Sequence, residues 1–454
     1  MKLPVEPPKF DDLFKRVLAE PNGPERFAKL SLAGIGPAPG GKYRHWDTFR
    51  HFDSNDGLTV DERWLAVKLA RKQLYQELPL KDAKGMPFRY ALPGPALEML
   101  HLIDRDASGS IQASDQVTNP QTRDTYLIKS LVEEAIASSQ LEGASTTRQV
   151  AKEMLKTGRE PRDRSERMIL NNYNAMHFLR RFVGEDLTPS IVFELQKILT
   201  EGTLDTPDAA GRFRRADEPI QIEDEIGTVL HVPPGARELE RRMERMCEFA
   251  NARTFDSFIH PVVRAITLHF LLGYDHPFVD GNGRTARALF YWSMARQGYW
   301  LCEYISISRV LKKARSKYAR SFLYTESDEN DLTYFLLYQL KVILVAIREL
   351  HEYLARKQEE LRRTEELLRR GTRLRFELTP RQLALLNHSL KKPDAVYTVE
   401  SHRRSHNVSY ETSRSDLLEL VKRGLLTQSK RGRAFFFTPS ADLNSRISAA
   451  VDDT

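Results

Sequence analysis

The sequence is poor in cysteine and has no long hydrophobic run. Its 454 residues include only Cys247 and Cys302, which match neither a disulfide framework nor the ligand spacing of a zinc site. The longest apolar run, 335–347, is interrupted by Gln339 and Lys341 and is too short to span a bilayer. The first residues lack the apolar segment of a signal peptide. These absences predict a cytoplasmic protein in a reducing environment, without a membrane partner.

Neither sign of charge dominates the composition. The chain has 69 Lys and Arg against 62 Asp and Glu, and 41% of its residues are hydrophobic. These proportions are those of a soluble globular protein, and the length is sufficient for two or three domains. The net charge of +7 permits a nucleic-acid or acidic partner without requiring one.

The sequence does contain one segment, 276–287, that combines a histidine, a carboxylate, a glycine-rich turn and two arginines. The Gly-Asn-Gly sequence at 281–283 predicts a turn, because Gly and Asn tolerate positive φ. A helix is predicted from Arg284, because no helix breaker follows until Gly298. A glycine-rich turn that leads into a helix offers free backbone N–H groups and the positive end of the helix dipole to an anion.

Four side chains of this segment suit polyphosphate chemistry. Arg284 and Arg287 lie three residues apart, and both can donate to outer phosphates from the first helical turn. Asp280 precedes the turn, where its carboxylate can hold Mg²⁺ on those phosphates. His276 has an intrinsic pKa near neutrality, so it can accept a proton from an attacking hydroxyl. Each residue alone has an ordinary structural interpretation, and only their conjunction at fixed spacing indicates a site.

A second informative segment lies upstream. Apolar residues recur at helical spacing within about 126–143, and Gly143 predicts the end of that helix. Ser145 or Thr146 is expected to cap the next helix. The helix dipole disfavours a carboxylate at the C-terminal end of a helix, where Glu142 lies, so Glu142 is expected to have a compensating cation.

The segment 276–287 resembles the motif of the Fic family, H-x-F-x-[D/E]-G-N-G-R-x-x-R, at every specified position. Ser138, Glu142 and Gly143 resemble that family's inhibitory motif, [S/T]-x-x-x-E-[G/N]. The resemblance implies a mainly α fold, with an all-helical core and a small β-hairpin flap. It also implies an adenylyltransferase that moves AMP from ATP to a Ser, Thr or Tyr hydroxyl of a protein, which could be the chain itself.

The resemblance assigns roles to individual residues around the α-phosphate. It implies that His276 deprotonates the target hydroxyl and that Asp280 holds Mg²⁺ between the α- and β-phosphates. It implies that Gly281, Asn282 and Gly283 cradle the α-phosphate with backbone and amide donors.

The resemblance also assigns the residues farther from the reacting atom. It implies that Arg284 binds the β-phosphate and Arg287 the γ-phosphate. Tyr318 lies where the family often places a residue beside the adenosine, although a simply packed helix residue is the alternative. Glu142 is implied to pair with Arg287, which would keep the arginine from the γ-phosphate and make the enzyme autoinhibited.

A hairpin is predicted at about 211–234 from short β-branched runs around an acidic turn. Its position resembles the flap of the Fic family, where Ile220, Gln221 and Ile222 would align an extended target segment by strand addition. A structural hairpin without a partner is the alternative.

The chain is predicted to divide into four parts. They are an N-terminal helical region, a Fic core that includes the inhibitory helix and the flap, a connector helix, and a winged-helix-like domain with a tail, at 1–115, 116–338, 339–372 and 373–454. The heptad repeat of the connector lapses at its d positions, which favours packing against one neighbour over a homodimer zipper, without excluding the homodimer.

The last part predicts three helices followed by a basic hairpin, which resembles a winged helix-turn-helix. Between Val399 and Phe436, eight Lys and Arg stand against four Asp and Glu. The predicted recognition helix itself carries acidic residues. DNA binding and protein binding therefore both stay open for this part.

Three further functions remain as alternatives to adenylyl transfer. Glu142 could position a water that removes AMP instead of adding it. The core could sense nucleotide for a DNA-binding regulator, although the intact His276 argues against a core that has lost catalysis. A different phosphate-linked group could be the one transferred, because the assignment of ATP rests on the resemblance.

Overall fold

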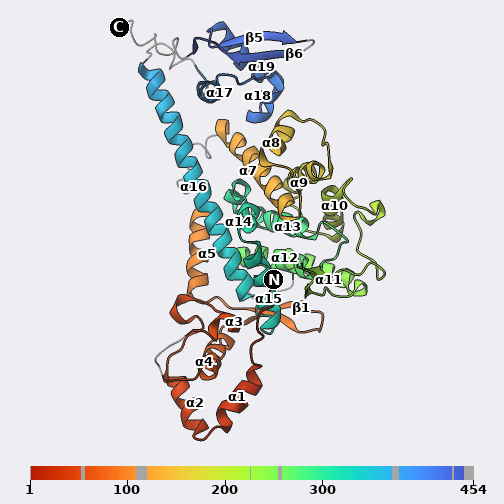
Figure 1. The fold of residues 1–454 in the computed structure, drawn as a ribbon, viewed down its shortest axis with the longest axis vertical. Coiled ribbons are helices and arrows are strands. Elements are labelled where there is room, and N and C mark those ends of the chain that lie inside the picture. The colour runs from red at the N-terminus through yellow and green to blue at the C-terminus, as the bar shows by residue number, and fades with distance from the viewer. Residues whose placement is uncertain are drawn as a thin grey trace.

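The computed structural model describes residues 2–52, 57–108, 120–224, 226–253, 258–370, 378–431 and 434–443. This part of the chain is mainly helical, and its strands form three separate antiparallel pairs. The predicted mainly α fold class is therefore confirmed. Figure 1 shows the first helices at one end of the molecule, the last helices at the other end, and the remaining helices between them. The predicted boundary at residue 115 lies outside the described residues.

The N-terminal region has a small apolar core of its own around Phe49 and Trp64. Thr59 and Glu62 form the capping box that starts α4. The region is not wholly helical, because β1 and β2 pair within it. Its elements are α1 (Phe10–Ala19), α2 (Gly23–Leu32), α3 (Trp46–Phe49), α4 (Val60–Lys72), β1 (Gln76–Lys81), β2 (Pro87–Tyr90) and α5 (Gly94–Ala107).

The central part is a bundle of helices around α12 and α13. α12 is buried on nearly every side, as expected for a mostly apolar helix, and its buried residues also include Arg264 and His269. Thr147, not the predicted Ser145 or Thr146, caps α8, because its hydroxyl accepts from the N–H of Val150 at 3.4 Å. The elements are α7 (Pro120–Leu141), α8 (Arg148–Thr157), α9 (Arg164–Arg181), α10 (Pro189–Thr200), β3 (Ile222–Glu223), β4 (Val229–His231), α11 (Leu239–Ala250), α12 (Pro261–Asp275), α13 (Asn282–Arg296), α14 (Ile307–Lys313) and α15 (Arg315–Ser327).

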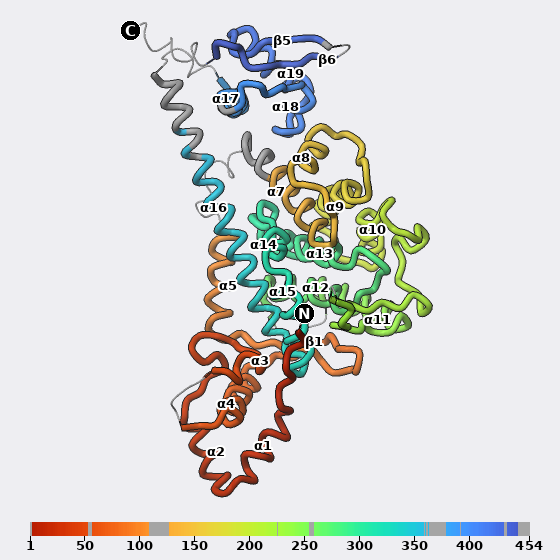
Figure 2. Tube along the Cα trace, in the orientation of Figure 1, coloured from red at the N-terminus to blue at the C-terminus, as the bar shows by residue number. Residues whose placement is uncertain are grey.

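A single long helix, α16 (Thr333–Arg370), runs lengthwise along the molecule (Figure 1). It begins before the predicted connector at 339, because its first turns belong to the core, where Leu340, Ile343 and Ile347 are buried. In the trace of Figure 2, α5 runs beside it. Among the described residues, no helix is long and apolar enough to cross a membrane.

The C-terminal part follows the predicted order of three helices and a hairpin. Its elements are α17 (Pro380–Lys391), α18 (Val399–His406), α19 (Tyr410–Lys422), β5 (Leu426–Arg431) and β6 (Ala434–Pro439). These elements share a separate apolar core. α18 lies against α7 and α8, and a Cβ placed on Gly158, after α8, would overlap the guanidinium of Arg404. Residues 371–377 and 444–454 of the predicted connector, winged-helix-like domain and tail lie outside the described residues.

Candidate active site

His276 stands at the C-terminal end of α12 in the left-handed conformation, with φ of 42°. Its Nδ1 lies 2.7 Å from the carbonyl oxygen of Gly273, which can only accept, so Nδ1 carries the proton. Nε2 of the neutral ring is then free to act as a base. Burial lowers the pKa of His276, while the Gly273 carbonyl and the Glu142 carboxylate offset part of that effect. The side chain is therefore neutral at pH 7 and competent to take a proton.

The turn after His276 is shorter than the sequence predicts. Only Gly281 has positive φ, at 87°, and α13 begins at Asn282, two residues before the predicted start. A Cβ on Gly281 would lie 2.9 Å from Thr200 of α10. Gly281 is the N-cap residue of α13, and within the described part of the chain no side-chain cap bond reaches the first N–H groups. This helix N-terminus is consequently available to an anion.

Asn282 holds the shape of this loop with its side chain. The amide oxygen accepts from the N–H of Phe278 at 3.0 Å, and the amide nitrogen donates to the carbonyl of Phe278 at 2.7 Å. The side chain is thus engaged within the loop in both directions. The amide nitrogen has two hydrogens and this bond uses one of them, so the predicted donation from Asn282 to a phosphate stays a prediction beside that of the backbone N–H groups.

Gly283 is a helical residue that makes room for Glu142. A Cβ on Gly283 would lie 2.1 Å from Oε1 of Glu142 and 3.0 Å from Nη1 of Arg287. Glycine leaves room here for the Glu142 carboxylate, and Gly283 does not have the positive φ that the sequence suggests. The Glu142 carboxylate lies over the first turn of α13, where an anion is expected to bind.

Arg287 connects α13 to α7. Its Nε donates to Oγ of Ser138 at 2.9 Å, and its Nη2 donates to the Ser138 carbonyl at 3.2 Å. The same Nη2 lies 2.9 Å from Oε1 of Glu142. Burial works against the charge of Arg287, yet Glu142 contributes to a pKa raised above the ordinary value. Nη1 is buried and has no hydrogen-bond partner among the described residues.

Gly143, the third residue of the predicted inhibitory motif, ends the same segment. It follows α7 with φ of 97°, a left-handed conformation that favours glycine. The chain can therefore turn away immediately after Glu142. The structure thus brings Ser138 and Glu142 to Arg287, with Gly143 closing the turn beside them.

Arg284 turns toward α10 instead of α7. Its Nη1 donates to the carbonyl of Leu199 at 2.7 Å, and its Nη2 lies 3.2 Å from Oδ2 of Asp280. Its Nε is buried without a partner among the described residues. Asp280 also accepts the N–H of Gly281 at 2.5 Å, and its side chain is 42% exposed. The two arginines thus have different neighbours, although both side chains are buried at the start of α13.

Tyr318 lies on α15, where its hydroxyl is 2.8 Å from Nε2 of His269. Burial raises the pKa of Tyr318 and lowers that of His269 to about 3, so both side chains are neutral. Tyr318 is close enough to Arg287 and Glu142 to interact with both electrostatically. The structure therefore places Tyr318 beside the other predicted residues and also packs it within the core.

The predicted flap is a short antiparallel hairpin. β3 pairs with β4, with Ile222 opposite His231, and Asp224 closes the turn by accepting the N–H of Thr228 at 2.9 Å. Ile220 and Gln221 precede the strand, so only Ile222 of the predicted docking residues belongs to it.

Sequence reasoning missed two buried residues that shape the site. Gln196 on α10 donates to the Asp280 carbonyl at 3.0 Å and accepts the N–H of Gly211 at 2.6 Å, and no local pattern signals it. Glu134 on α7 is 2% exposed and lies four residues before Ser138 on the same helix, and eight residues before Glu142, which follows the helix end. That helical spacing is a signal that could have identified Glu134.

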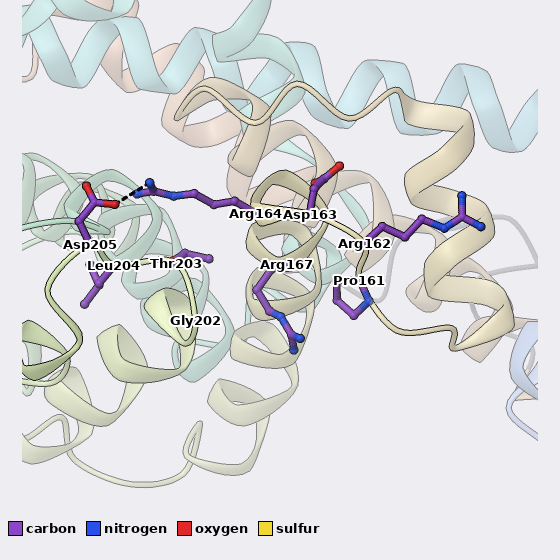
Figure 3. Close-up of a pocket in the computed structure, with 9 residues that line it drawn as sticks. All are labelled: Pro161, Arg162, Asp163, Arg164, Arg167, Gly202, Thr203, Leu204 and Asp205. Atoms are coloured by element: carbon purple, nitrogen blue, oxygen red, sulfur yellow. Dashed lines mark hydrogen bonds and ion pairs between the residues drawn. The ribbon is translucent and has the colours of Figure 1, made fainter.

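A hollow of about 340 Å³ lies at the start of α9 (Figure 3). It is lined by 161–164, Arg167 and 202–205, and Arg164 reaches across to Asp205 at 2.9 Å. None of the predicted site residues lines it. The candidate active site is instead the junction of α7, α12 and α13.

Comparison with known proteins finds similarity in this part of the chain. Residues 186–294 match the model of the Fic/DOC family. The chain carries a Fic domain. The match to the Fic domain includes α10, the flap and the whole of 276–287, whereas Ser138, Glu142 and Tyr318 lie outside it.

Curated relatives of the Fic domain carry the name "Protein adenylyltransferase Fic". The one from Drosophila willistoni is 31% identical over 134 residues, which are 28% of this chain and 25% of the relative. The one from Drosophila melanogaster is 29% identical over 197 residues, which are 43% of this chain and 37% of the relative. The chain thus spans only about a quarter to a little over a third of the length of these relatives.

A solved structure has the same fold. The crystal structure of a Fic family protein from Desulfovibrio desulfuricans G20 matches with a TM-score of 0.50 at 17% identity. The match covers 78% of this chain and 98% of that protein. At this level of identity, the likeness shows the fold alone.

Proposed function

We propose that this chain is a protein adenylyltransferase, which moves AMP from ATP to a Ser, Thr or Tyr hydroxyl of a protein and is autoinhibited by Glu142. One observation carries the proposal: beside His276, the Glu142 carboxylate occupies a place next to the N-terminus of α13 and to Nη1 of Arg287, and neither has a side-chain partner among the described residues. The Fic domain match and the names of the curated relatives support it.

The chemistry follows from the position of each group. Nε2 of His276 takes the proton from the target hydroxyl, whose oxygen forms a bond to the α-phosphorus. The bond from that phosphorus to the bridging oxygen breaks, and pyrophosphate leaves. The N–H groups of α13 stabilise the negative charge on the α-phosphate. Arg284 and Arg287 bind the β- and γ-phosphates, and Tyr318 lies beside the adenosine.

Asp280 is the residue that would hold Mg²⁺. Its carboxylate is partly exposed and uses part of its accepting capacity on Gly281 and Arg284, so lone pairs remain for an ion. The described residues contain no group of three metal-ligating side chains. One carboxylate together with substrate phosphates is a usual set of Mg²⁺ ligands. When bound, the ion supplies positive charge to the phosphates.

Glu142 would inhibit by competition. Its carboxylate pairs with the group that the γ-phosphate needs, and it repels that phosphate. A hydrogen bond to a charged group contributes about 1.5–3 kcal/mol, so the productive pose becomes about one to two orders of magnitude rarer.

Glu142→Gly is the test of this proposal. Incubation with ATP and Mg²⁺, followed by intact-mass measurement, is expected to show AMP addition about ten to a hundred times faster than in the wild type. Adding His276→Ala should abolish addition while ATP still binds, because the base does not contact the triphosphate. Arg287→Ala should not mimic the gain, because it also removes the phosphate contact. Equal or slower addition by Glu142→Gly would refute autoinhibition.

Removal of AMP is the second candidate, favoured by the 32% exposure of the Glu142 side chain, which leaves the carboxylate accessible to a water. Incubation of AMP-modified protein with the wild type and with Glu142→Gln separates the two activities. Loss of AMP that needs the carboxylate would support removal.

The partners belong to the same proposal. The protein substrate would dock along Ile222 of the flap, and the C-terminal part would select partners by binding DNA or protein, with a homodimer and a cytoplasmic location as further predictions. Electrophoretic mobility shift and analytical ultracentrifugation test the DNA and homodimer predictions.

A further inference from the structure

His231, the last residue of β4, joins three elements of the core. Its ring is buried, with Nδ1 2.7 Å from Oε2 of Glu326 on α15 and Nε2 2.7 Å from the carbonyl oxygen of Tyr274 on α12. The His231 ring also packs on the Tyr274 ring, at 4.7 Å between centroids. The flap is therefore held at its second strand by two short hydrogen bonds.

The two acceptors determine where the protons of this ring lie. A carbonyl oxygen only accepts, so Nε2 carries a proton. An ionised carboxylate also only accepts, so Nδ1 carries one as well. With Glu326 ionised, His231 is an imidazolium that donates in both directions.

These contacts reach the turn that presents the candidate base. Tyr274 precedes His276 by two residues, and Arg214 of the flap segment donates from Nε to the His276 carbonyl at 2.8 Å. Nη2 of the same arginine donates to the carbonyl of Pro234, just after β4. Within the hairpin, His231 of β4 lies opposite Ile222 of β3. The backbone around His276 and the predicted docking strand are therefore held by the same side chains.

We propose that His231, kept in its charged form by Glu326, is a positioning residue that fixes the flap and the backbone around His276 relative to each other. The catalytic part of this inference rests on the proposed adenylyl transfer. We call the hydrogen bonds of His231 to Glu326 and to the Tyr274 carbonyl the clamp. An acceptor hydroxyl carried by a segment on β3 would reach Nε2 of His276 only while these bonds are formed, because proton transfer requires hydrogen-bond distance.

The charges around His231 give the clamp a pH dependence. It is faced by Glu326 from α15 and by Tyr274, Asp275 and His276 from α12 and its C-terminal end. Asp275 is itself paired with Arg242 of α11 at 2.7 Å.

These surroundings act oppositely on the two histidines. Burial alone would lower the pKa of His231, but the hydrogen bond and charge of Glu326 raise it above its ordinary value. The stabilisation that charged His231 gives to the flap is then fully present below the ordinary histidine pKa, and it is lost as the pH rises through the raised pKa of His231. The pKa of His276 is lowered, so transfer is expected between the two values, with the alkaline limit set by His231.

The experiment uses the full chain in the Glu142→Gly background, so that transfer is measurable. Glu326→Gln keeps the shape of the partner and removes its charge, and it is expected to shift the alkaline limit of the pH profile to lower pH. His231→Ala is expected to lower kcat about ten- to a hundred-fold, with the KM for ATP changed less than about two-fold. His101→Ala, at an exposed position on α5, is the control and should change neither.

A second measurement does not depend on activity. The side-chain NMR titration of His231 should give a pKa above the ordinary value, and Glu326→Gln should lower it. The protection of the β3 and β4 amides from hydrogen exchange should fall over the same pH range. This arm separates the clamp from the proposed function, because transfer can be absent while His231 still titrates as expected.

Three outcomes would overturn the inference. The first is a His231 pKa at or below the ordinary value, and the second is an alkaline limit that Glu326→Gln leaves in place while transfer proceeds. The third is a folded His231→Ala protein that transfers AMP with an unchanged kcat. If His231→Ala does not fold, the titration and Glu326→Gln still decide.

Discussion

At Gly283, the carboxylate of Glu142 approaches the first turn of α13 so closely that no Cβ fits between them. Gly283→Ala is therefore expected to displace Glu142 and break its ion pair with Arg287. Loss of a hydrogen bond to a charged group costs about 1.5–3 kcal/mol, which should appear as a lower free energy of unfolding. In the Glu142→Gly background, the same alanine should cost less, because the clash is gone.

Chemical denaturation of the four proteins in this cycle measures the coupling. Gly184→Ala is the matched control, because a Cβ there meets nothing within 4 Å. An equal cost of Gly283→Ala in both backgrounds would show that Glu142 does not occupy this space.

His276 carries the second prediction at this scale. A base must be neutral, and burial lowers the pKa of His276 below its ordinary value. Transfer by Glu142→Gly should therefore persist as the pH falls through the ordinary histidine pKa and decline only below it. A pH profile of kcat checks this, and an acidic limit at or above the ordinary value would contradict it.

At the scale of the element, α7 is held by a carboxylate in its middle. Glu134 accepts from the hydroxyls of Tyr291 at 2.9 Å and Ser306 at 2.8 Å, and from both the N–H and the hydroxyl of Ser308. Glu142 follows Leu141, the last residue of this helix, eight residues after Glu134. The hydrogen bonds of Glu134 therefore fix α7 and, with it, the place where Glu142 meets Arg287.

Glu134→Gln should loosen α7 and raise the rate of AMP addition in the otherwise wild-type chain. The reason is that an amide nitrogen cannot accept, so at least one of the four donors loses its partner, at a cost of about 1–3 kcal/mol. Intact-mass rates and hydrogen exchange of α7 measure the effect. Glu133→Gln is the control, because the Glu133 carboxylate pairs with Arg148 of α8 at 2.7 Å instead of with the groups that Glu134 holds. If Glu134→Gln loosens α7 but AMP addition is not faster, then the hydrogen bonds of Glu134 do not contribute to inhibition.

At the scale of the whole molecule, α18 lies directly on α7 and α8, while the Fic motif and Glu142 lie in the bundle beneath. Removal of 373–454 is expected to leave the transfer chemistry intact and to change which proteins are modified. The reason is that this part has its own apolar core and contributes none of the proposed catalytic groups. Self-modification and modification of lysate proteins, in the Glu142→Gly background, measure the two effects. A folded truncated chain that no longer transfers AMP would contradict this division.

The sequence by itself determined the features that depend on neighbouring residues. The motif at 276–287 and the turn at Gly143 that follows α7 are local, because turns depend on residues within a few positions. The same local rules misplaced the start of α13 and the cap of α8. They also missed β1 and β2.

Only the tertiary structure decided how distant segments meet. Ser138 and Arg287 are 149 residues apart and Gln196 and Asp280 are 84 apart, yet both pairs are bonded. His231 and Tyr274 are joined across 43 residues. Helical spacing shows which residues share a face, but the burial of that face against another helix selects its partners. The reason is that contacts between distant segments depend on the packing of the whole core, which no local pattern encodes.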